Sequence, residues 1–518
     1  MTQPVSPELV IDDQCLRIED VLDLAHQRRT GSLSSAPEFR ARIAQGADFL
    51  DRLLQEDGVI YGVTTGYGDS CTTRIPPDLV TQLPQHLYTF HGCGLGAEFS
   101  PLVGRAVLVT RLVSLARGYS GVSYELLQGL TQLLQLDLVP IIPEEGSVGA
   151  SGDLTPLSYV AAVLCGEREV YYRGERRLTA EVFAELDIKP LKLRPKEGLA
   201  LMNGTAVMTA LACLAYGRTQ YLIQLATRIT ALVTVAIQGN AHHFDERLFA
   251  TKPHPGQQQI AAWLRADLYP GGHADEPPRN PHRLQDRYSL RCAPHVIGVA
   301  NDSLPWWRQF IENELNSAND NPIVDAVGEH VLHGGHFYGG HIAFVMDTMK
   351  TAVANIADLL DRQLAQLVDP KFNQGLPANL SGATGPRSAI NHGFKAVQIG
   401  VSAWTAEALK LTMPASVFSR STECHNQDKV SMGTIAARDC LRVLQLTEQV
   451  AAASLLAACQ GVELRQPSAA NDPTLTGGIA TTLAEIRRTY PFLDEDRALD
   501  KELRQLIASI QQQGLSLY

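Results

Sequence analysis

The feature that most restricts the fold of this 518-residue chain is a series of long apolar segments with helical periodicity. They follow one another from about residue 197 onward, and few glycines or prolines interrupt them. The predicted helices cover residues 206–240, 302–315, 341–367, 393–411 and 430–461. Helices this long and this apolar cannot all face one small core, so they predict a bundle in which long helices pack along one another.

The rest of the chain predicts shorter elements. Residues 101–137 predict two amphipathic helices that separate near Gly118 and Gly121, residues 154–164 a further helix, and residues 169–178 a hairpin that turns at Arg173-Gly174. The Pro-, His- and Arg-rich segment 251–291 is expected to be irregular. The predicted fold class is mainly α, with a small α+β N-terminal part.

The length of the chain indicates more than one packed region. We expect an N-terminal domain over residues 1–205 and, over residues 206–518, a long-helix bundle followed by a C-terminal helical region.

Composition excludes several classes of function. The net charge of −11, without a long basic run, argues against a nucleic-acid partner or an anionic membrane. No stretch is apolar and long enough to span a bilayer, and the first residues lack the apolar segment of a signal peptide. The nine scattered cysteines lack Cys-x-x-Cys spacing, which predicts reduced thiols and a cytoplasmic location. Charged residues make up only 19%, which indicates surface buried between subunits.

The most unusual sequence is the small-residue loop Glu144-Glu-Gly-Ser-Val-Gly-Ala-Ser-Gly-Asp-Leu154. One interpretation is a flexible turn that ends in a helix N-cap at Asp153, with Pro156 in the first turn. A second is a nucleophilic serine, which is disfavoured because the Gly-x-Ser-x-Gly elbow is missing. The third uses the tripeptide Ala150-Ser151-Gly152 itself.

In this third interpretation the backbone closes on itself. If the chain bends tightly, the Gly152 nitrogen can attack the Ala150 carbonyl carbon, and loss of water closes a five-membered ring. Loss of the Ser151 hydroxyl as a second water leaves an exocyclic methylene, which is a strong electrophile. Small residues permit so compressed a backbone, and a helix that begins at Asp153 would direct its positive dipole at the ring carbonyl.

The loop sequence Gly146-Ser-Val-Gly-Ala-Ser-Gly-Asp-Leu154 resembles the signature of the aromatic amino acid lyases, which comprise histidine, phenylalanine and tyrosine ammonia-lyases and related aminomutases. The resemblance covers nearly the whole chain in the same order. It implies that Ala150, Ser151 and Gly152 form 4-methylidene-imidazol-5-one (MIO) autocatalytically, with no external cofactor. It also implies a central long-helix bundle of the aspartase/fumarase-like type, and a homotetramer whose active sites draw on more than one subunit.

Two further motifs in the N-terminal part match the family. Tyr61-Gly-Val-Thr-Thr-Gly-Tyr-Gly68 resembles its mobile inner loop, whose first tyrosine takes the β-proton, so that role falls to Tyr61. A phenol has a pKa of about 10, so this role requires hydrogen bonds or positive charge that stabilise the phenolate. Tyr67 is expected to be structural. Asn203, in an Asn-Gly-Thr element, would bond the ring or the substrate carboxylate, although it could instead be a helix cap.

The motif Gln285-Asp-Arg-Tyr-Ser-Leu-Arg291 also matches the family. Positions 285, 288 and 291 are three residues apart, so a helical turn would bring their side chains near one face. The resemblance assigns acid/base support to Tyr288 and binding of the substrate carboxylate to Arg291, whose guanidinium can donate two parallel hydrogen bonds. Gln285 is expected to bind substrate beside them.

Two clusters further along the chain complete the expected site. The segment Asn316-Ser-Ala-Asn-Asp-Asn-Pro322 is typical of the family, and Asn321 is expected to shape the floor of the site, unless the segment is only an Asx turn. His333-Gly-Gly-His-Phe-Tyr-Gly-Gly-His341 lacks a familiar zinc spacing, so we predict no metal. Phe337 matches the family's phenylalanine near the electrophile, whereas His336 replaces an asparagine.

Two positions bear on the substrate. In the family, the pair at Phe90-His91 faces the substrate side chain: histidine-specific members tend to have Ser-His, phenylalanine-type members Phe-Leu, and many tyrosine-specific members His-Leu or Ser-His. Histidine-specific members also carry a glutamate where this chain has Gln427, and a neutral amide would hold an imidazole less well. We therefore predict tyrosine as the favoured substrate, as in bacterial tyrosine ammonia-lyases, with phenylalanine also accepted.

The predicted reaction is elimination of ammonia, which gives trans-4-coumarate from tyrosine and trans-cinnamate from phenylalanine. The alternatives are a histidine ammonia-lyase, which gives urocanate, and an aromatic aminomutase, which adds the ammonia back at the β-carbon. A non-catalytic helical scaffold is disfavoured because Tyr61, Ser151 and Arg291 are all present.

Overall fold

The computed structural model of the chain describes residues 8–56, 58–269, 284–466 and 477–518 and divides into two compact units. The first unit consists of Met1–Gly217, Trp307–Asp347 and Pro414–Arg438, and the second of Arg218–Trp306, Thr348–Met413 and Asp439–Tyr518. Helices account for 59% of the structure and strands for 7%, which confirms the mainly α prediction. The continuous division at residues 205 and 206 stays a prediction.

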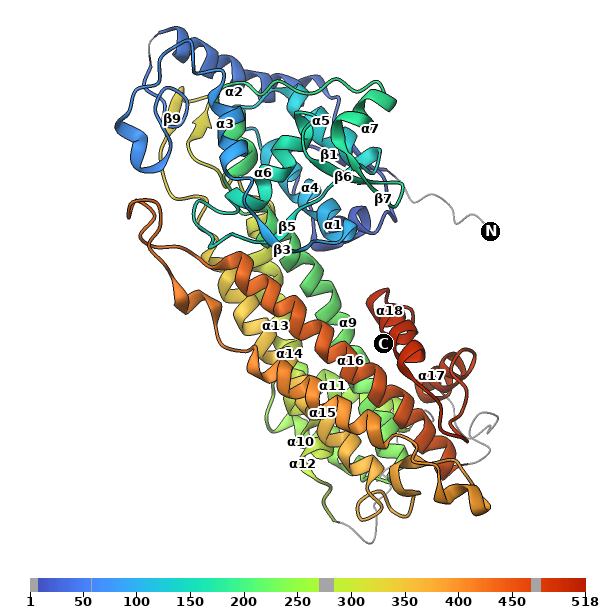
Figure 1. The fold of residues 1–518 in the computed structure, drawn as a ribbon. Helices are drawn as coiled ribbons and strands as arrows, with labels where there is room; N and C mark the ends of the chain where they lie inside the picture. Colours follow the sequence, from blue (N-terminus) through green and yellow to red (C-terminus); the bar gives the residue numbers. More distant parts are fainter. Residues whose placement is uncertain (1–7, 57, 270–283, 467–476) are drawn as a thin grey trace. The chain divides into compact units, whose positions relative to one another are not determined.

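In the first unit, short helices alternate with small sheets (Figure 1). Its helices are α1 (Ile18–Ala25), α2 (Pro37–Gln55), α3 (Leu83–Phe90), α4 (Pro101–Ala116), α5 (Tyr124–Gln135), α6 (Leu154–Leu164), α7 (Thr179–Glu185) and α8 (Glu197–Met202). α6 matches its predicted bounds, and nearly all of its side chains are buried, as expected for a helix that is apolar on every face. Pro101 begins α4, where its missing N–H needs no partner.

Four small sheets complete the first unit. β1 (Leu9–Ile11) pairs in parallel with β2 (Gly31–Leu33), and β3 (Leu95–Glu98) pairs antiparallel with β5 (Pro143–Glu145). β4 (Val139–Pro140), β6 (Glu169–Tyr172) and β7 (Glu175–Leu178) form an antiparallel sheet, in which β6 and β7 are the predicted hairpin. β8 (Ile323–Asp325) pairs with β9 (His330–Leu332).

The longest helices are α9 (Ala206–Ala236), α13 (Ala293–Leu315), α14 (Gly340–Val368) and α16 (Gly433–Arg465), and each has a part in both units. The predicted helices at these places are confirmed, but α13 begins earlier than residue 302. Pro305 lies inside α13, where proline disfavours a helix, yet the helix continues because Ile297 and Ala300 before it are buried.

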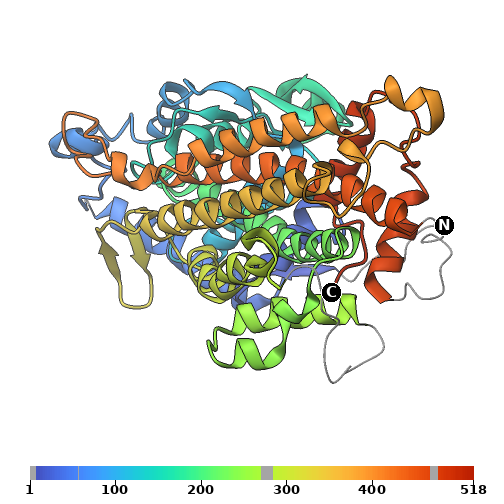
Figure 2. The same cartoon turned by 90° about the horizontal axis from the view of Figure 1, so that it is seen from below.

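In the second unit, the parts of α9, α14 and α16 and the helix α15 (Lys395–Lys410) run along one another in one bundle, as Figures 1 and 2 both show. Hydrogen bonds between side chains of neighbouring helices tie this bundle together. They join Gln363 to Thr230 at 3.0 Å, Ser402 to Asp361 at 2.9 Å, Arg442 to Glu407 at 2.6 Å and Arg218 to Glu448 at 2.7 Å. The predicted bundle of long helices is therefore present within this unit.

The remaining helices of the second unit are α10 (Glu246–Ala250), α11 (Pro255–Leu268), α12 (Tyr288–Arg291), α17 (Gly477–Arg487) and α18 (Asp500–Gln511). The expectation that residues 251–291 are irregular is wrong for α11. Pro255 suits the first position of a helix, and Ile260, Ala261 and Leu264 then form a buried apolar face. Residues 270–283 lie outside the described residues. No helix of the described part is both long and apolar enough to cross a membrane.

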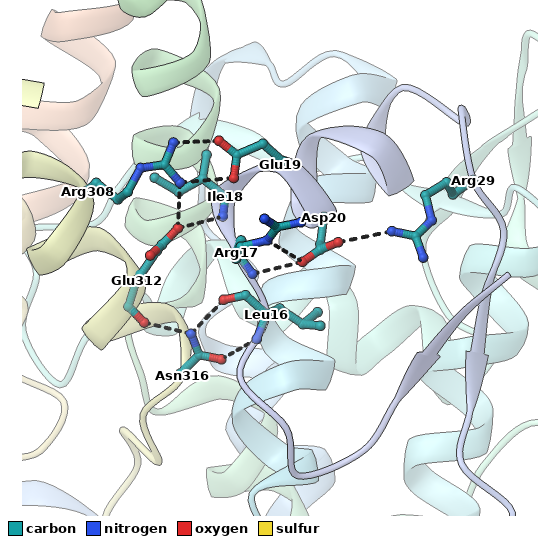
Figure 3. Close-up of polar contacts among 9 residues, drawn as sticks. All are labelled: Leu16, Arg17, Ile18, Glu19, Asp20, Arg29, Arg308, Glu312 and Asn316. Atoms are coloured by element: carbon teal, nitrogen blue, oxygen red, sulfur yellow. Dashed lines mark hydrogen bonds and ion pairs between the residues drawn. The ribbon is translucent and has the colours of Figure 1, made fainter. Parts of the chain in front are cut away.

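A polar cluster in the first unit fixes the end of α13 and the following Asn316 against residues 16–20 (Figure 3). The Arg308 guanidinium donates to Glu19 of α1 at 2.9 Å and to Glu312 at 2.8 Å. The Asn316 amide pairs with both backbone groups of Leu16, each at 2.8 Å, although 300 residues separate the two. The cluster therefore positions the segment that leads from α13 to Asn321.

Candidate active site

The first unit contains a cavity of about 1030 Å³. Six stretches of the chain line it: the Gly-rich loop 61–71, the end of α3, residues 149–154, residues 199–203, residues 321–338 and residues 423–429. Nine residues predicted for the site line this cavity: Tyr61, Phe90, His91, Ala150, Ser151, Asn203, Asn321, Phe337 and Gln427. Sequence-distant positions that the family motifs assign to one site are thus brought together.

The loop through Ser151 has the tight bend that ring closure requires. Gly149, Ser151 and Gly152 all have positive φ, at 73°, 52° and 78°. Gly152 also lies so close to Gly204 that an added Cβ would be 2.1 Å from the Gly204 carbonyl oxygen, so only glycine fits. A tight bend of small residues, with positive φ at Ser151 and Gly152, fits the backbone cyclisation described above.

Two donors converge on the carbonyl oxygen of Ser151. The Asn203 side chain donates to it at 2.7 Å and the Gly204 N–H at 3.2 Å. This oxygen would become the carbonyl of the closed ring, so both donors would withdraw electron density from the ring. Asn203 is buried, and its side-chain oxygen has no hydrogen-bond partner among the described residues, which leaves it able to accept a bond from a bound molecule.

Asp153 follows the tripeptide at the N-cap position of α6, but its side chain does not cap that helix. It turns instead to α9, where it accepts the Met208 N–H at 2.9 Å, and it also accepts the Thr434 hydroxyl. The expectation of an ordinary N-cap is corrected here: the carboxylate serves the first turn of α9, where N–H groups lack partners. Complete burial raises the pKa of Asp153 to about 6.

Tyr61 lies on the Gly-rich loop, and its phenolic oxygen accepts the Gly68 N–H at 2.7 Å. Burial raises the pKa of Tyr61, the Gly68 N–H opposes that rise, and the nearby Glu423 carboxylate adds to it. The surroundings in this chain therefore disfavour the phenolate, in contrast to the environment that a base needs. Tyr67 packs nearby and its hydroxyl lies 3.4 Å from the Leu83 carbonyl, in keeping with a structural role.

Phe90 and His91 lie at the end of α3 with ring centroids 4.3 Å apart. The His91 Nδ1 lies 2.9 Å from the Leu87 carbonyl, which can only accept, so Nδ1 carries the proton and Nε2 is the acceptor of the neutral ring. Burial lowers the pKa of His91 and favours this neutral form. His91 can therefore accept a hydrogen bond from a substrate side chain.

Gln427 and Glu423 lie on one short segment at the cavity, in which Thr422 and Gln427 form an antiparallel bridge. Gln427 donates to the Ser151 hydroxyl at 3.2 Å. Both carboxylate oxygens of Glu423 accept the Asp69 N–H, at 2.9 and 3.1 Å. Sequence reasoning missed Glu423. Among the described residues that line the cavity, Glu423 is the one with an acidic side chain. The signal available in the sequence was the position of Glu423, four residues before the predicted site residue Gln427.

The histidine-rich segment 333–341 contributes the rings of His333, Phe337 and Tyr338 to the cavity. His333 lines it, and its ring meets that of Tyr61 edge-on, with centroids 6.5 Å apart. Asn321 accepts the Gly334 N–H at 2.8 Å, so it braces this segment. In the residues that the structure describes, no three His, Cys, Asp or Glu side chains are grouped as metal ligands would be.

Three predicted residues lie elsewhere. Gln285, Tyr288 and Arg291 belong to the second unit, and none of them lines the cavity. Tyr288 and Arg291 begin and end α12, and the Arg291 guanidinium lies over the Tyr288 ring at 4.7 Å. Tyr288 is 71% exposed. Their roles stay predictions.

Comparisons with known proteins agree over the length of the chain. The profile of the family described as aromatic amino acid lyase matches residues 16–488. A histidine ammonia-lyase of Stigmatella aurantiaca is 36% identical over 97% of this chain and 96% of its own, and one of Bos taurus is 36% identical over 90% and 70%.

Solved structures agree as well. A tyrosine aminomutase from Streptomyces globisporus is similar with a TM-score of 0.89 and 33% identity, over 98% of this chain and 97% of its own. A histidine ammonia-lyase from Trypanosoma cruzi gives a TM-score of 0.88 and 30% identity, over 98% and 94%.

Proposed function

The chain belongs to the aromatic amino acid lyase family, and from this we propose that it eliminates ammonia from L-histidine to give urocanate. As a member of the family, it is a carbon–nitrogen lyase. The observation that carries the choice of substrate is the full-length similarity to proteins named histidine ammonia-lyase, in bacteria and in animals.

The prediction of tyrosine as the favoured substrate is contradicted by these relatives, which are named for histidine at 34–37% identity. That prediction relied on Gln427, an amide where histidine-specific members have a carboxylate. It left out other acidic groups that reach the cavity. Glu423 is such a group, so the absence of a carboxylate at position 427 does not exclude an imidazole.

The cavity lining offers two acceptors for imidazole N–H groups, so a protonated imidazole could be bound at both nitrogens and a neutral one at its single N–H. The Glu423 carboxylate can accept a ring N–H or pair with a protonated ring. The neutral His91 can accept a ring N–H through Nε2, because its own Nδ1–H is bound to Leu87. Phe90 supplies an apolar wall beside them.

We also propose that Ala150, Ser151 and Gly152 form MIO, on which the family depends. When formed, this group supplies the electrophile that turns the substrate amine into a leaving group. Asn203 and Gly204 would bind the former Ser151 carbonyl oxygen through the two hydrogen bonds already present. Gln427 lies at the Ser151 hydroxyl, which is lost as water during cyclisation.

In the first unit, burial and the Glu423 carboxylate raise the pKa of Tyr61 against the Gly68 N–H, although Lys429 also lines the cavity. We propose that Tyr61 takes the β-proton, and that positive charge lowers its raised pKa when the site is complete. Arg291, with Tyr288 and Gln285, would come from another copy of the chain in a homotetramer, with Arg291 bound to the substrate carboxylate. The low charged fraction of 19% and the exposed Tyr288 support this arrangement. A cytoplasmic location stays a prediction.

A second candidate function is an aromatic aminomutase. It is favoured by the similarity to the tyrosine aminomutase structure and by the neutral Gln427, which lines the cavity together with Phe90. An aminomutase would retain the released ammonia and return it to the β-carbon, so the two functions differ in their product.

Product analysis tests both. Purified protein is incubated separately with histidine, phenylalanine and tyrosine, and products are identified by mass spectrometry. Urocanate with an equal amount of ammonia supports the proposal, and β-amino acids support the aminomutase. Cinnamate or coumarate without urocanate would contradict histidine as the substrate.

A further inference from the structure

Glu167 and Arg168 are adjacent residues that do not line the cavity. Both bind the helix that leads to Phe90 and His91. The Arg168 guanidinium donates to the backbone carbonyl of Tyr88, in the last turn of α3. The Glu167 carboxylate accepts the Tyr88 hydroxyl at 2.8 Å. Tyr88 is thus bound at its backbone and at its side chain, and it lies between Leu87 and Phe90, which both line the cavity.

Arg168 also joins the end of α3 to α6. Its Nη1 donates to the Ser158 hydroxyl at 3.0 Å, and that hydroxyl lies 3.2 Å from the His91 carbonyl. The guanidinium lies over the ring of Tyr159, also on α6, at 4.1 Å. Its Nη2 would be 2.4 Å from a Cβ at Gly92, so glycine is required for this approach.

α6 is the helix that directly follows Ala150-Ser151-Gly152. A side chain that ties the end of α3 to α6 therefore links Phe90 and His91 on one side to the segment that carries Ser151 on the other. Arg168 suits this task because its planar fork can bind several oxygens at once. The backbone of Arg168 has a φ of +62°. The neighbouring Glu167 is exposed.

The same residue bears on the chemical state of His91. Burial is the main cause of the lowered pKa of His91. The hydrogen bond to the Leu87 carbonyl raises this pKa, and the positive charge of Arg168 lowers it further. A neutral His91 presents Nε2 as an acceptor, whereas a protonated ring would repel a cationic substrate side chain.

From these contacts we propose that Arg168 is a positioning residue for substrate selection, which holds Phe90 and His91 at the correct distance from Ser151. The inference rests on the proposed function in one respect, that Phe90 and His91 face the substrate side chain. It does not depend on which aromatic amino acid is preferred.

The test compares Arg168→Met with Arg168→Lys and with Arg105→Met. Arg105 is a matched control, since it pairs with Asp137 at 2.7 Å and lies within 3.3 Å of the Ala25 carbonyl, in the same unit but outside the cavity lining. For each variant, kcat and KM are measured with histidine, phenylalanine and tyrosine, and intact mass reports whether two waters have been lost.

In Arg168→Met we expect KM for the preferred substrate to rise by roughly 10-fold, the size of one or two lost hydrogen bonds. The kcat/KM values for the three substrates should become more similar to one another, and kcat should change less than KM. The intact mass should still show the loss of two waters that accompanies ring formation. Arg168→Lys keeps the charge and should recover part of the ratio. Arg105→Met should leave both KM and the ratio within about twofold of wild type.

If Arg168→Met fails to fold, Ser158→Ala replaces it in the test. This variant removes the hydroxyl that accepts from Arg168 and reaches the His91 carbonyl, and it should shift the kcat/KM ratio between substrates in the same direction. Dissociation constants for the three amino acids, measured in a Ser151→Ala background, give the same ratio without turnover. If wild type prefers phenylalanine or tyrosine, the proposed substrate fails while this test stands. Unchanged ratios in both Arg168→Met and Ser158→Ala would overturn the inference.

Discussion

Ser151 combines a strained backbone with two hydrogen-bond donors on its carbonyl oxygen. Its φ of 52° is costly for a residue with a Cβ, and such strain persists only where the surrounding structure imposes it. The donors come from Asn203 and Gly204, which follow Ser151 by about fifty residues. The local sequence supplied the tripeptide, and the contact with Asn203-Gly204 makes its carbonyl electron-poor.

Ser151→Ala tests the origin of the electrophile. Without the hydroxyl, the second water cannot be lost and no methylene can form, so activity should fall by at least about 1,000-fold. Intact mass should place wild type two waters below the mass of its sequence, and the variant should lack that deficit. Ser303→Ala, at a helix residue of the second unit whose hydroxyl binds Val299, should behave as wild type. Near-normal turnover in Ser151→Ala would contradict ring formation.

The structure places Glu423 at the cavity, although the sequence analysis assigned it no role. Glu423→Gln is expected to lower kcat/KM for histidine by roughly 10- to 100-fold, because a hydrogen bond to a charged group contributes about 1.5–3 kcal/mol. The glutamine can still accept the Asp69 N–H, so the loop contact is kept. Kinetics with histidine and phenylalanine measure the effect, and phenylalanine, which has no ring N–H, should be affected much less.

The matched control for Glu423→Gln is Glu329→Gln, at an exposed carboxylate that pairs with Arg52 outside the cavity lining. It should leave both substrates unchanged. Equal losses for histidine and phenylalanine in Glu423→Gln would mean that the carboxylate acts on a group common to both substrates, such as the amine.

At the scale of elements, Asp153 joins α6 to α9 and to Thr434 at the start of α16. A buried carboxylate at this junction must be desolvated whenever it is ionised. The three elements that enclose the loop therefore depend on the protonation state of one side chain, which gives the fold a pH dependence.

Asp153 should make the protein less stable as pH rises from about 4 to about 6. Its pKa is about 6 when folded and 3.8 ordinarily, so in this window the folded state holds more protons than the unfolded chain. The free energy of unfolding then falls with pH, by on the order of 3 kcal/mol from this group. Asp153→Asn cannot titrate, so urea denaturation of both proteins across this range should show their difference change by that amount.

Asp78→Asn, at an exposed carboxylate, serves as the control and should track wild type at every pH. A constant difference between wild type and Asp153→Asn from pH 4 to 7 would mean that Asp153 does not titrate in this window.

At the scale of the whole molecule, the residues expected to complete the site lie in the second unit. Arg291 and Tyr288 do not line the cavity of the first unit, and the pKa of Tyr61 is raised there. Symmetric assemblies can place a surface of one copy against a different surface of another, which is how a second copy would supply this charge.

Complementation between inactive chains tests this arrangement. Ser151→Ala and Arg291→Ala, each inactive alone, are produced together with different tags and purified through both. Mixed assemblies should regain part of the activity, because some sites then combine an intact Ser151 from one copy with an intact Arg291 from another. Mixed assemblies without activity would indicate that both residues act within one copy.

The amino-acid sequence by itself determined the elements that depend on local spacing. The bounds of α6, the β6–β7 hairpin and the places of the long helices follow from local sequence patterns, because helix and turn formation depend on neighbours a few positions apart. The exact ends of the long helices did not follow, since α13 begins nine residues before its predicted start at residue 302. The small residues of the Ser151 loop likewise predicted its tight bend.

Only the tertiary structure decided what depends on distant residues. Asp69 and Glu423 are 354 residues apart in the chain, yet their contact brings a carboxylate into the cavity. The raised pKa values of Tyr61 and Asp153 come from burial, and Asp153 serves α9 rather than its own helix. Burial and long-range hydrogen bonds arise from packing between segments, and that packing leaves no periodic pattern in the sequence.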